Sequence, residues 1–328
     1  MISNLSKVLV LDVSSYVGGH LFNHLGKKRA VGTYFRSPIA GCRYFDALSM
    51  GLADVVHNPE ECSHAVILFA DTKPDSCAAD VVKSRALNVD STKRVIDRLV
   101  EWQIKPIFAS TESVFDGVSG NYVESDTPNP ILIYGQQKLE IEEYLQDYCQ
   151  HFTIVRLAKV FGSQRGDSTL FTSWLDAIAR SEIIHCAYDQ VFSPIHVEDV
   201  VESISRLIDL DCDGVYHIAN TGAYSRIQLL YTLLDQLREI SSVEVKVVPC
   251  SIHDFDLTEK RPLDVSMTPG KLIKSTGIQI KSIEEAVGQL VTSVSDALGS
   301  LALDTPRPRT GSRSGAPTGS EFPATKLV

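Results

Sequence analysis

Tyr134 and Lys138 are the residues whose types and spacing point most directly to chemistry, within IYGQQKLEIEEYL (133–145). Apolar residues at helical spacing predict that this segment opens a helix, so the four-residue interval places both side chains on one face. An ammonium beside a phenol favours the phenolate, which would lower the pKa of Tyr134 and poise it to donate or accept a proton. Because such pairs also arise by chance, the neighbouring segments must support the interpretation.

That support comes from IFASTESVFDG (107–117), a buried strand pattern that ends in Ser110 and Thr111. A hydroxyl at the carboxyl end of a strand can hydrogen-bond a substrate carbonyl beside the phenol. Thr111, Tyr134 and Lys138 together would then suit hydride transfer to a ketone. The alternative is that these hydroxyls only cap the helix that follows.

The first strand-to-helix turn, LDVSSYVGGHL (11–21), lies where a dinucleotide pyrophosphate rests on backbone N–H groups. The expected spacing is G-x-x-G-x-x-G, but only the third glycine is present. The first glycine normally permits the tight turn and the second permits close approach of the phosphates, and an aspartate here adds a carboxylate near the pyrophosphate. The segment is either an ordinary strand–turn–helix or a cofactor site made by Asp12, Ser15, Tyr16, Val17 and Gly18.

Arg36, in TYFRS (33–37), stands where NAD-specific domains usually place an acidic residue for the ribose hydroxyls. A guanidinium there could pair with the 2′-phosphate of NADP. The sequence therefore favours NADP(H), with NAD(H) possible, although a solvated loop arginine is an equal alternative.

Short strand patterns alternate with helical patterns in the first half of the chain, which is typical of a parallel sheet covered on both faces. The expected strands are 7–12, 30–35, 63–70, 105–110 and 152–158, joined later by 214–220 and 243–249. The expected helices are 18–25, 80–100, 136–150 and 168–180, with a further helix ending near residue 210.

These patterns predict an α/β protein: a doubly wound parallel-sheet Rossmann domain with a smaller, discontinuous α/β substrate lobe. We assign residues 1–162 and 192–223 to the first and residues 163–191 and 224–298 to the second. Such a lobe closes over the strand ends, where ligands bind in open α/β sheets. The Pro-, Gly-, Ser- and Thr-rich residues 299–328 are expected to form a disordered tail.

Composition narrows the possible partners. With a formal charge of −10 and no basic run, the surface should repel nucleic acid. No apolar stretch is long enough to span a membrane and no signal-peptide pattern is present, so we expect a cytoplasmic protein. The seven cysteines are scattered without a CxxC pair, and His20 and His24 lack a third ligand, which predicts neither a disulfide framework nor a metal site.

STESVFDG (110–117) and YGQQK (134–138) resemble the dTDP-4-dehydrorhamnose reductase family of extended short-chain dehydrogenases, whose pattern is close to STDYVFDG followed by YGxxK. The resemblance runs over roughly residues 5 to 290. It extends to FADTKPDSC (69–77), to Asn88 in ALNVDST, to RLAKVFG (156–162), to DQVFSPIHVEDVV (189–201) and to KRPLDVSM (260–267).

The resemblance implies an NADP(H)-dependent reductase of a 4-keto-6-deoxy sugar nucleotide in deoxysugar biosynthesis, with catalysis by Thr111, Tyr134 and Lys138. Superfamily members often pair as homodimers, which is a further expectation. The implied cofactor residues are Phe69, Ala70, Asp71, Asn88, Ser110, Tyr134 and Lys138, in addition to the first turn. The implied substrate residues are Thr72, Ser113, Phe115 and Arg261, the last clasping the diphosphate.

Two departures leave other functions open. Glu112-Ser113 replaces the family's Asp-Tyr, which removes an aromatic side chain, and the glycine turn is degenerate. One alternative is a sugar-nucleotide epimerase or another oxidoreductase with a retained cofactor. Another is a non-catalytic nucleotide-binding relative, resembling the regulatory β subunit of methionine adenosyltransferase. The eroded glycines favour this last function, whereas the intact Thr111, Tyr134 and Lys138 oppose it.

Overall fold

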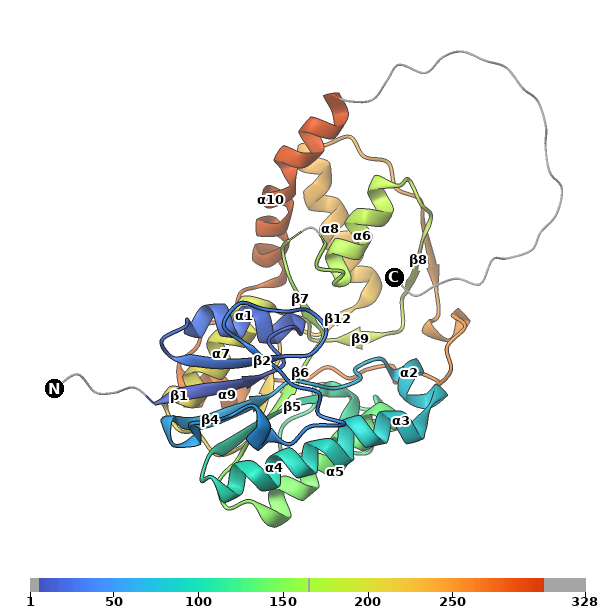
Figure 1. The fold of residues 1–328 in the computed structure, drawn as a ribbon. Helices are drawn as coiled ribbons and strands as arrows, with labels where there is room; N and C mark the ends of the chain where they lie inside the picture. Colours follow the sequence, from blue (N-terminus) through green and yellow to red (C-terminus); the bar gives the residue numbers. More distant parts are fainter. Residues whose placement is uncertain (1–5, 165, 304–328) are drawn as a thin grey trace.

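The computed structural model describes residues 6–164 and 166–303, and a parallel sheet of seven strands forms its centre (Figure 1). The strand order is β11-β6-β5-β4-β1-β2-β3, so the chain runs outward from β1 first in one direction and then in the other. This is the predicted doubly wound arrangement. The strands are β1 (Lys7–Leu11), β2 (Ala30–Tyr34), β3 (Arg43–Tyr44), β4 (Cys62–Ile67), β5 (Lys105–Thr111), β6 (Thr153–Leu157) and β11 (Gly214–Ile218).

Helices cover both faces of the sheet, because successive side chains of each strand point to opposite sides. In β1, Val8 and Val10 join the core under α1 (Tyr16–Leu25), α7 (Val197–Asp209) and α9 (Gly270–Thr276). Leu9 and Leu11 join the opposite core, under α4 (Thr92–Glu101) and α5 (Ile133–Tyr148). The apolar run of β1 is therefore buried on both sides.

The helical segment predicted over 80–100 is interrupted. It consists of α3 (Val81–Arg85), a wide π-type turn (Ala86–Ser91) and α4, and it is preceded by α2 (Pro74–Ala79), which the sequence analysis missed. The π-type turn places buried Asn88 beside the end of β4. Such turns are frequent at functional sites.

A second layer lies above the sheet and has a core of its own around Trp174 (Figure 1). Its helices are α6 (Leu170–Ala179), α8 (Arg226–Ile240) and α10 (Ile283–Leu303). Its short strands pair β8 (Ile184–Ala187) with β13 (Val247–Cys250) and β9 (Val191–Phe192) with β12 (Tyr224–Ser225). Another short pair, β7 (Val160–Phe161) with β10 (Ile195–His196), follows the end of β6. Short 3-10 helices cover Leu52–Asp54, Pro59–Glu61, Glu112–Val114 and Ile252–Asp254.

Two predicted boundaries are wrong. The strand expected at 243–249 begins only at Val247, and helix α10 continues to Leu303, past the expected start of the tail. The remainder of that tail, 304–328, lies outside the described residues. The residue boundaries assigned to the two lobes stay a prediction.

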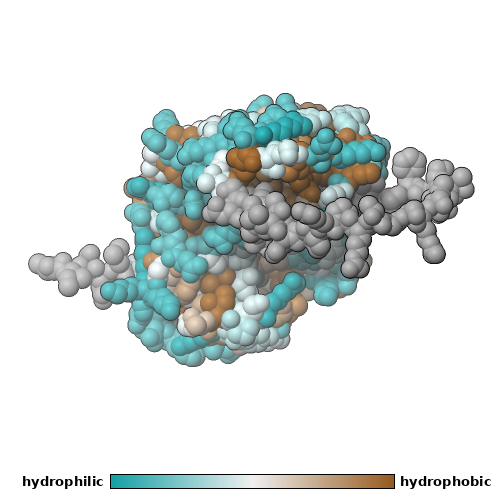
Figure 2. Space-filling view, turned by 90° about the horizontal axis from the view of Figure 1, so that it is seen from above, coloured by the Kyte–Doolittle hydropathy of each residue, from teal (hydrophilic) through white to brown (hydrophobic). Residues whose placement is uncertain are grey.

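The surface seen in Figure 2 mixes hydrophilic side chains with separate apolar patches. None of the described helices is both long and apolar enough to cross a membrane.

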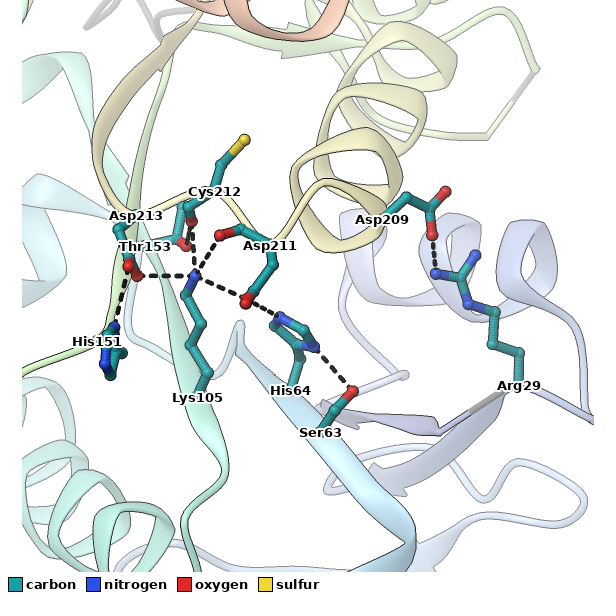
Figure 3. A network of polar contacts seen from close by, with 10 residues as sticks. All are labelled: Arg29, Ser63, His64, Lys105, His151, Thr153, Asp209, Asp211, Cys212 and Asp213. Carbon is teal, nitrogen blue, oxygen red and sulfur yellow. Dashed lines mark hydrogen bonds and ion pairs between the residues drawn. The ribbon is translucent and has the colours of Figure 1, made fainter. Parts of the chain in front are cut away.

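The amino ends of the central strands are joined by a network around Lys105 (Figure 3). The Lys105 ammonium lies 3.0 Å from an Asp211 carboxylate oxygen and 2.7 Å from one of Asp213. His64 contacts Asp211 at 3.1 Å, and His151 contacts Asp213 at 3.0 Å. These contacts tie the loop before β11 to β4, β5 and the segment before β6, on the edge opposite the candidate site.

Candidate active site

The predicted site residues gather at the carboxyl edge of the sheet, beneath the second layer. Asp12 follows β1, residues 69–72 follow β4, and Thr111 ends β5, while Tyr134 lies in the first turn of α5. Because carboxyl ends of parallel strands meet at one edge, residues far apart in sequence become neighbours there.

Thr111, Tyr134 and Lys138 form one buried cluster. The Thr111 hydroxyl is hydrogen-bonded to the Tyr134 phenol and also accepts the Ser113 N–H at 3.1 Å. Lys138 donates to the Ala109 carbonyl at 2.8 Å, and its ammonium lies 5.9 Å from the centre of the Tyr134 ring. The helical spacing predicted from sequence thus places these side chains together against the end of β5.

The electrostatics of this cluster differ from the prediction. Burial raises the pKa of the Tyr134 phenol above its ordinary value near 10, although the Thr111 hydrogen bond opposes the shift. Burial lowers the pKa of Lys138 to about 8. The expected lowering of the phenol pKa by the ammonium is therefore outweighed by desolvation, and Tyr134 holds its proton at neutral pH.

Asp12 has the backbone conformation for which the missing first glycine would be suited. Its φ is +76°, a left-handed value that L side chains rarely adopt. Its N–H donates to the Thr33 hydroxyl at 3.0 Å, and its carboxylate accepts from the Ser14 hydroxyl. The turn therefore keeps its shape without the glycine, at the cost of backbone strain.

Ser15 and Gly18 complete the turn and start α1. Ser15 is the N-cap: its hydroxyl donates to the Asp12 carbonyl at 2.7 Å and accepts the Gly18 N–H at 3.2 Å. A Cβ on Gly18 would collide with the Asp12 carbonyl oxygen, so this position requires glycine. Val17 is half-buried, and Tyr16 donates to Asp167 at 3.0 Å.

Asn88 fixes the loop after β4. Its side-chain amide accepts the Asp71 N–H at 2.8 Å and donates to the Asp71 carbonyl at 3.0 Å. It also donates to Gln137 of α5 at 2.8 Å. Phe69 is buried against Phe45, whereas Ala70 and Asp71 are half-buried. Asn88 thus acts here by positioning the loop against α5.

Two predicted residues point into the protein interior. The Ser110 hydroxyl donates to Glu142, which is buried in an ion pair with Arg156. Phe115 is only 1% exposed and stacks on Tyr122. The substrate contact predicted for Phe115 does not fit this burial, and the Ser110 side chain is directed away from the Thr111 cluster because neighbouring strand residues alternate in direction.

Arg261 lies beside the loop that follows β4. Its guanidinium pairs with Asp75 of α2 at 2.7 Å and donates to the Glu259 carbonyl at 3.0 Å. Asp75 thereby links α2 to the segment that carries Arg261. The same segment supports α5, because Glu259 accepts the N–H of Ile133 at 3.0 Å.

A group of charges that was not predicted from sequence lies next to the Thr111 cluster. The carboxylate of Glu112 accepts the backbone N–H of Lys159, just after β6, at 3.2 Å. Burial lowers the pKa of Lys159, and the charges of Arg226 and Arg261 lower it further, while Glu112 opposes the shift. Burial also lowers the pKa of Arg226 to about 10. A cationic group, defined by Lys159, Arg226 and Arg261, therefore lies near Glu112, the residue that follows Thr111.

The other predicted positions are accessible to solvent. Arg36 and Thr72 are exposed, and Ser113 is half-buried. Two surface hollows lie away from the cluster: one of about 500 Å³ between α1 and α7, and one of about 520 Å³ at the amino edge of the sheet. Within the described residues, no group of three or more His, Cys, Asp or Glu side chains is arranged to hold a metal ion.

Known proteins resemble this chain over most of its length. A dTDP-4-dehydrorhamnose reductase of Sinorhizobium fredii is 25% identical over 234 residues, covering 69% of this chain and 78% of the relative. Methionine adenosyltransferase 2 subunit beta of Bos taurus is 24% identical, covering 72% and 73%. The fold matches that of a dTDP-4-dehydrorhamnose reductase of Bacillus anthracis solved in complex with NADP, with a TM-score of 0.73, 21% identity, and coverage of 88% and 99%.

The family model described as the RmlD substrate binding domain matches residues 9–295. The matched range contains the glycine-poor turn, the Thr111 cluster and the cationic group. This chain belongs to the RmlD substrate binding domain family.

Proposed function

We propose that this protein is an NADP(H)-dependent reductase of a 4-keto-6-deoxy sugar nucleotide. The observation that carries the proposal is the assembly of Thr111, Tyr134 and Lys138 into one buried cluster at the carboxyl edge of the sheet. Family membership and the similarity to dTDP-4-dehydrorhamnose reductases support it.

The residues present fit a dinucleotide cofactor. The amino end of α1, capped by Ser15 and packed closely through Gly18, offers backbone N–H groups to a pyrophosphate. Exposed Arg36, just after β2, suits a 2′-phosphate. Lys138 would contact the nicotinamide ribose. The bound cofactor would supply the hydride.

The chain's own residues would manage the proton. Tyr134 remains protonated at neutral pH, since burial raises its pKa, so it can protonate the alkoxide oxygen that develops from the ketone. Thr111, hydrogen-bonded to that phenol, would hold the same oxygen. This polarity favours reduction of a ketone over oxidation of an alcohol, which would require the phenolate first.

The cationic group would hold the anionic part of the substrate. Arg226 and Arg261 lie close enough to Lys159 for their charges to lower its pKa. In a protein of formal charge −10, such a local concentration of cations suits a diphosphate. The proposal also includes the lobe boundaries, the homodimer and the cytoplasmic location that were predicted from sequence.

A calorimetric titration with NADPH and NADH tests the cofactor. The proposal expects micromolar NADPH binding, weaker NADH binding, and loss of that preference in Arg36→Ala. The exposed Lys28→Ala variant on the loop before β2 is a charge-matched control. If neither dinucleotide binds at millimolar concentration, the reductase proposal is wrong.

A second candidate is a nucleotide-binding regulatory protein without turnover. Asp12 in the phosphate turn and the similarity to methionine adenosyltransferase 2 subunit beta favour it. Under this alternative, Tyr134→Phe would leave the regulatory function of the protein unchanged. Under the reductase proposal, the same substitution abolishes the protein's function because it removes the proton donor.

A further inference from the structure

Glu112 lies between the Thr111 cluster and the end of β6. It directly follows Thr111 and opens the 3-10 helix at the end of β5. Its carboxylate turns toward the end of β6, where it accepts the Lys159 N–H at 3.2 Å. The residue is half-buried beside the carboxyl ends of β5 and β6.

The surroundings of this carboxyl are unusual for a glutamate. Burial raises the pKa of Glu112 to about 7, and the Lys159 ammonium opposes the shift. The negative charge of Glu112 in turn raises the pKa of the Tyr134 phenol. Two acid–base groups of different strength therefore adjoin Thr111, an arrangement typical of sites that move two protons.

Reduction of a ketone uses only one of these groups. The hydride comes from the cofactor and Tyr134 supplies the proton, which leaves Glu112 without a role in the proposed reaction. A carbonyl whose oxygen is hydrogen-bonded by Thr111 and Tyr134 has acidified protons on the adjacent carbons, and a nearby carboxylate is a suitable base for them.

We propose, resting on the proposed function, that Glu112 is a general base that exchanges the proton on a carbon adjacent to the ketone of the sugar. The Glu112 carboxylate takes that proton, the C–H electron pair forms a C=C bond, and the carbonyl π pair moves to oxygen, which Tyr134 protonates. In the reverse step, Glu112 returns a proton to carbon while the enol oxygen returns its proton to Tyr134. No electrons enter or leave, so the exchange needs no NADPH.

The test is proton NMR of a dTDP-4-keto-6-deoxyhexose incubated with the protein in D₂O without NADPH. We expect the signals of the protons adjacent to the ketone to disappear faster than without protein. Glu112→Gln should slow this exchange at least ~100-fold, as expected for loss of a general base. It should slow NADPH-dependent reduction of the same sugar by less than ~10-fold. Tyr134→Phe should impair both reactions.

Controls separate a chemical role from a structural one. Glu143→Gln removes an exposed carboxylate from α5 and should leave both rates unchanged. Glu112→Asp, which keeps a carboxylate, should recover part of the exchange. In the wild-type protein the exchange rate should rise with pH as Glu112 loses its proton, and this dependence should vanish in Glu112→Gln.

The outcomes distinguish the two proposals. Reduction without exchange above the protein-free rate, or equal exchange by wild type and Glu112→Gln, overturns the role of Glu112 and leaves the reductase proposal standing. Absence of both reactions overturns both.

Discussion

At the residue scale, Asp12 shows that a turn can keep its conformation after losing the residue type that favours it. Its φ of +76° falls in the region that glycine adopts without cost, and the Thr33 and Ser14 contacts hold it there. The same carboxylate lies at the amino end of α1, where a pyrophosphate would bind. The residue is thus compatible with the fold but unfavourable for an anionic ligand.

Replacing Asp12 should therefore strengthen cofactor binding. Asp12→Asn removes the charge and should tighten NADPH binding about fivefold to tenfold, because like charges at this range repel by about 1 kcal/mol in solvent-exposed sites. Asp12→Gly removes the same charge and should tighten NADPH binding by a similar factor. Calorimetric titration measures both variants. Unchanged or weaker NADPH binding by Asp12→Asn would show that the carboxylate does not face the phosphates.

One physical reason explains why some residues near the site could not be predicted from sequence. Tyr134 and Lys138 are linked by helical spacing, which a sequence displays directly. Lys159 and Arg226 come from separate segments, and only the folded chain brings Arg226 and Glu112 near Lys159. For Glu112 the sequence did give a signal, since it replaces the aspartate of the family pattern, but its partner at the end of β6 could not be read from spacing.

At the element scale, helix α5 carries Tyr134 and Lys138 and is held against the sheet by two buried polar attachments. Near its start, Gln137 accepts from Asn88 and donates to Ser84 at 2.9 Å. Five residues further on, Glu142 pairs with Arg156 of β6 at 2.6 Å, and both side chains are at most 3% exposed. These attachments hold α5 against α3, the π-type turn and β6.

Breaking the buried ion pair should destabilise the protein strongly. Glu142→Gln leaves the Arg156 guanidinium without a counter-charge, which typically costs about 3–5 kcal/mol. Urea unfolding followed by circular dichroism measures the loss. The exposed Glu143→Gln variant should change the free energy of unfolding by less than ~0.5 kcal/mol. Similar small effects of the two substitutions would contradict the structural role assigned to the pair.

The major elements were predictable because each carries its own periodic pattern. Six of the seven strands of the main sheet and α5 were found within a few residues, whereas β3, β7, β9, β10 and β12 are two-residue strands too short to show a period. The break between α3 and α4 was missed because the π-type turn keeps helix-like spacing. Strands β8 and β13 form by pairing with each other, and a pairing between distant segments cannot be read from the local sequence of either one.

At the scale of the whole molecule, the two edges of the sheet have different tasks. The carboxyl edge carries the Thr111 cluster and the cationic group, and the second layer lies above it (Figure 1). The amino edge is closed by the Lys105 network, in which the ammonium bonds Asp211 and Asp213, and His64 also contacts Asp211 (Figure 3). We propose that the first edge serves the reaction, whereas the second ties the strands together.

The amino edge predicts how stability depends on pH. Burial lowers the pKa of His64 below its ordinary value near 6.5, so the fold favours the neutral ring and stability should fall as pH drops below about 6.5. The Lys105 ammonium lowers the pKa of Asp211, so that contribution is lost only at lower pH, below about 4.

Substitution of His64 tests this dependence. His64→Gln should flatten the decrease in the free energy of unfolding between pH 7 and 5, as measured by urea titration at each pH. His253→Gln, at an exposed position, should leave the slope unchanged. If the free energy of unfolding falls equally with decreasing pH in both variants, a group other than His64 causes the acid sensitivity.

The most direct test of the central claim is the oxidation of NADPH, followed by absorbance, with a dTDP-4-keto-6-deoxyhexose as the second substrate. The account predicts steady turnover by the wild-type protein. It also predicts that Tyr134→Phe folds normally and binds NADPH but loses at least ~100-fold in kcat, as expected for loss of the proton donor. Tight NADPH binding without turnover, or turnover by Tyr134→Phe at the wild-type rate, would contradict the assignment of the Thr111 cluster as the catalytic centre.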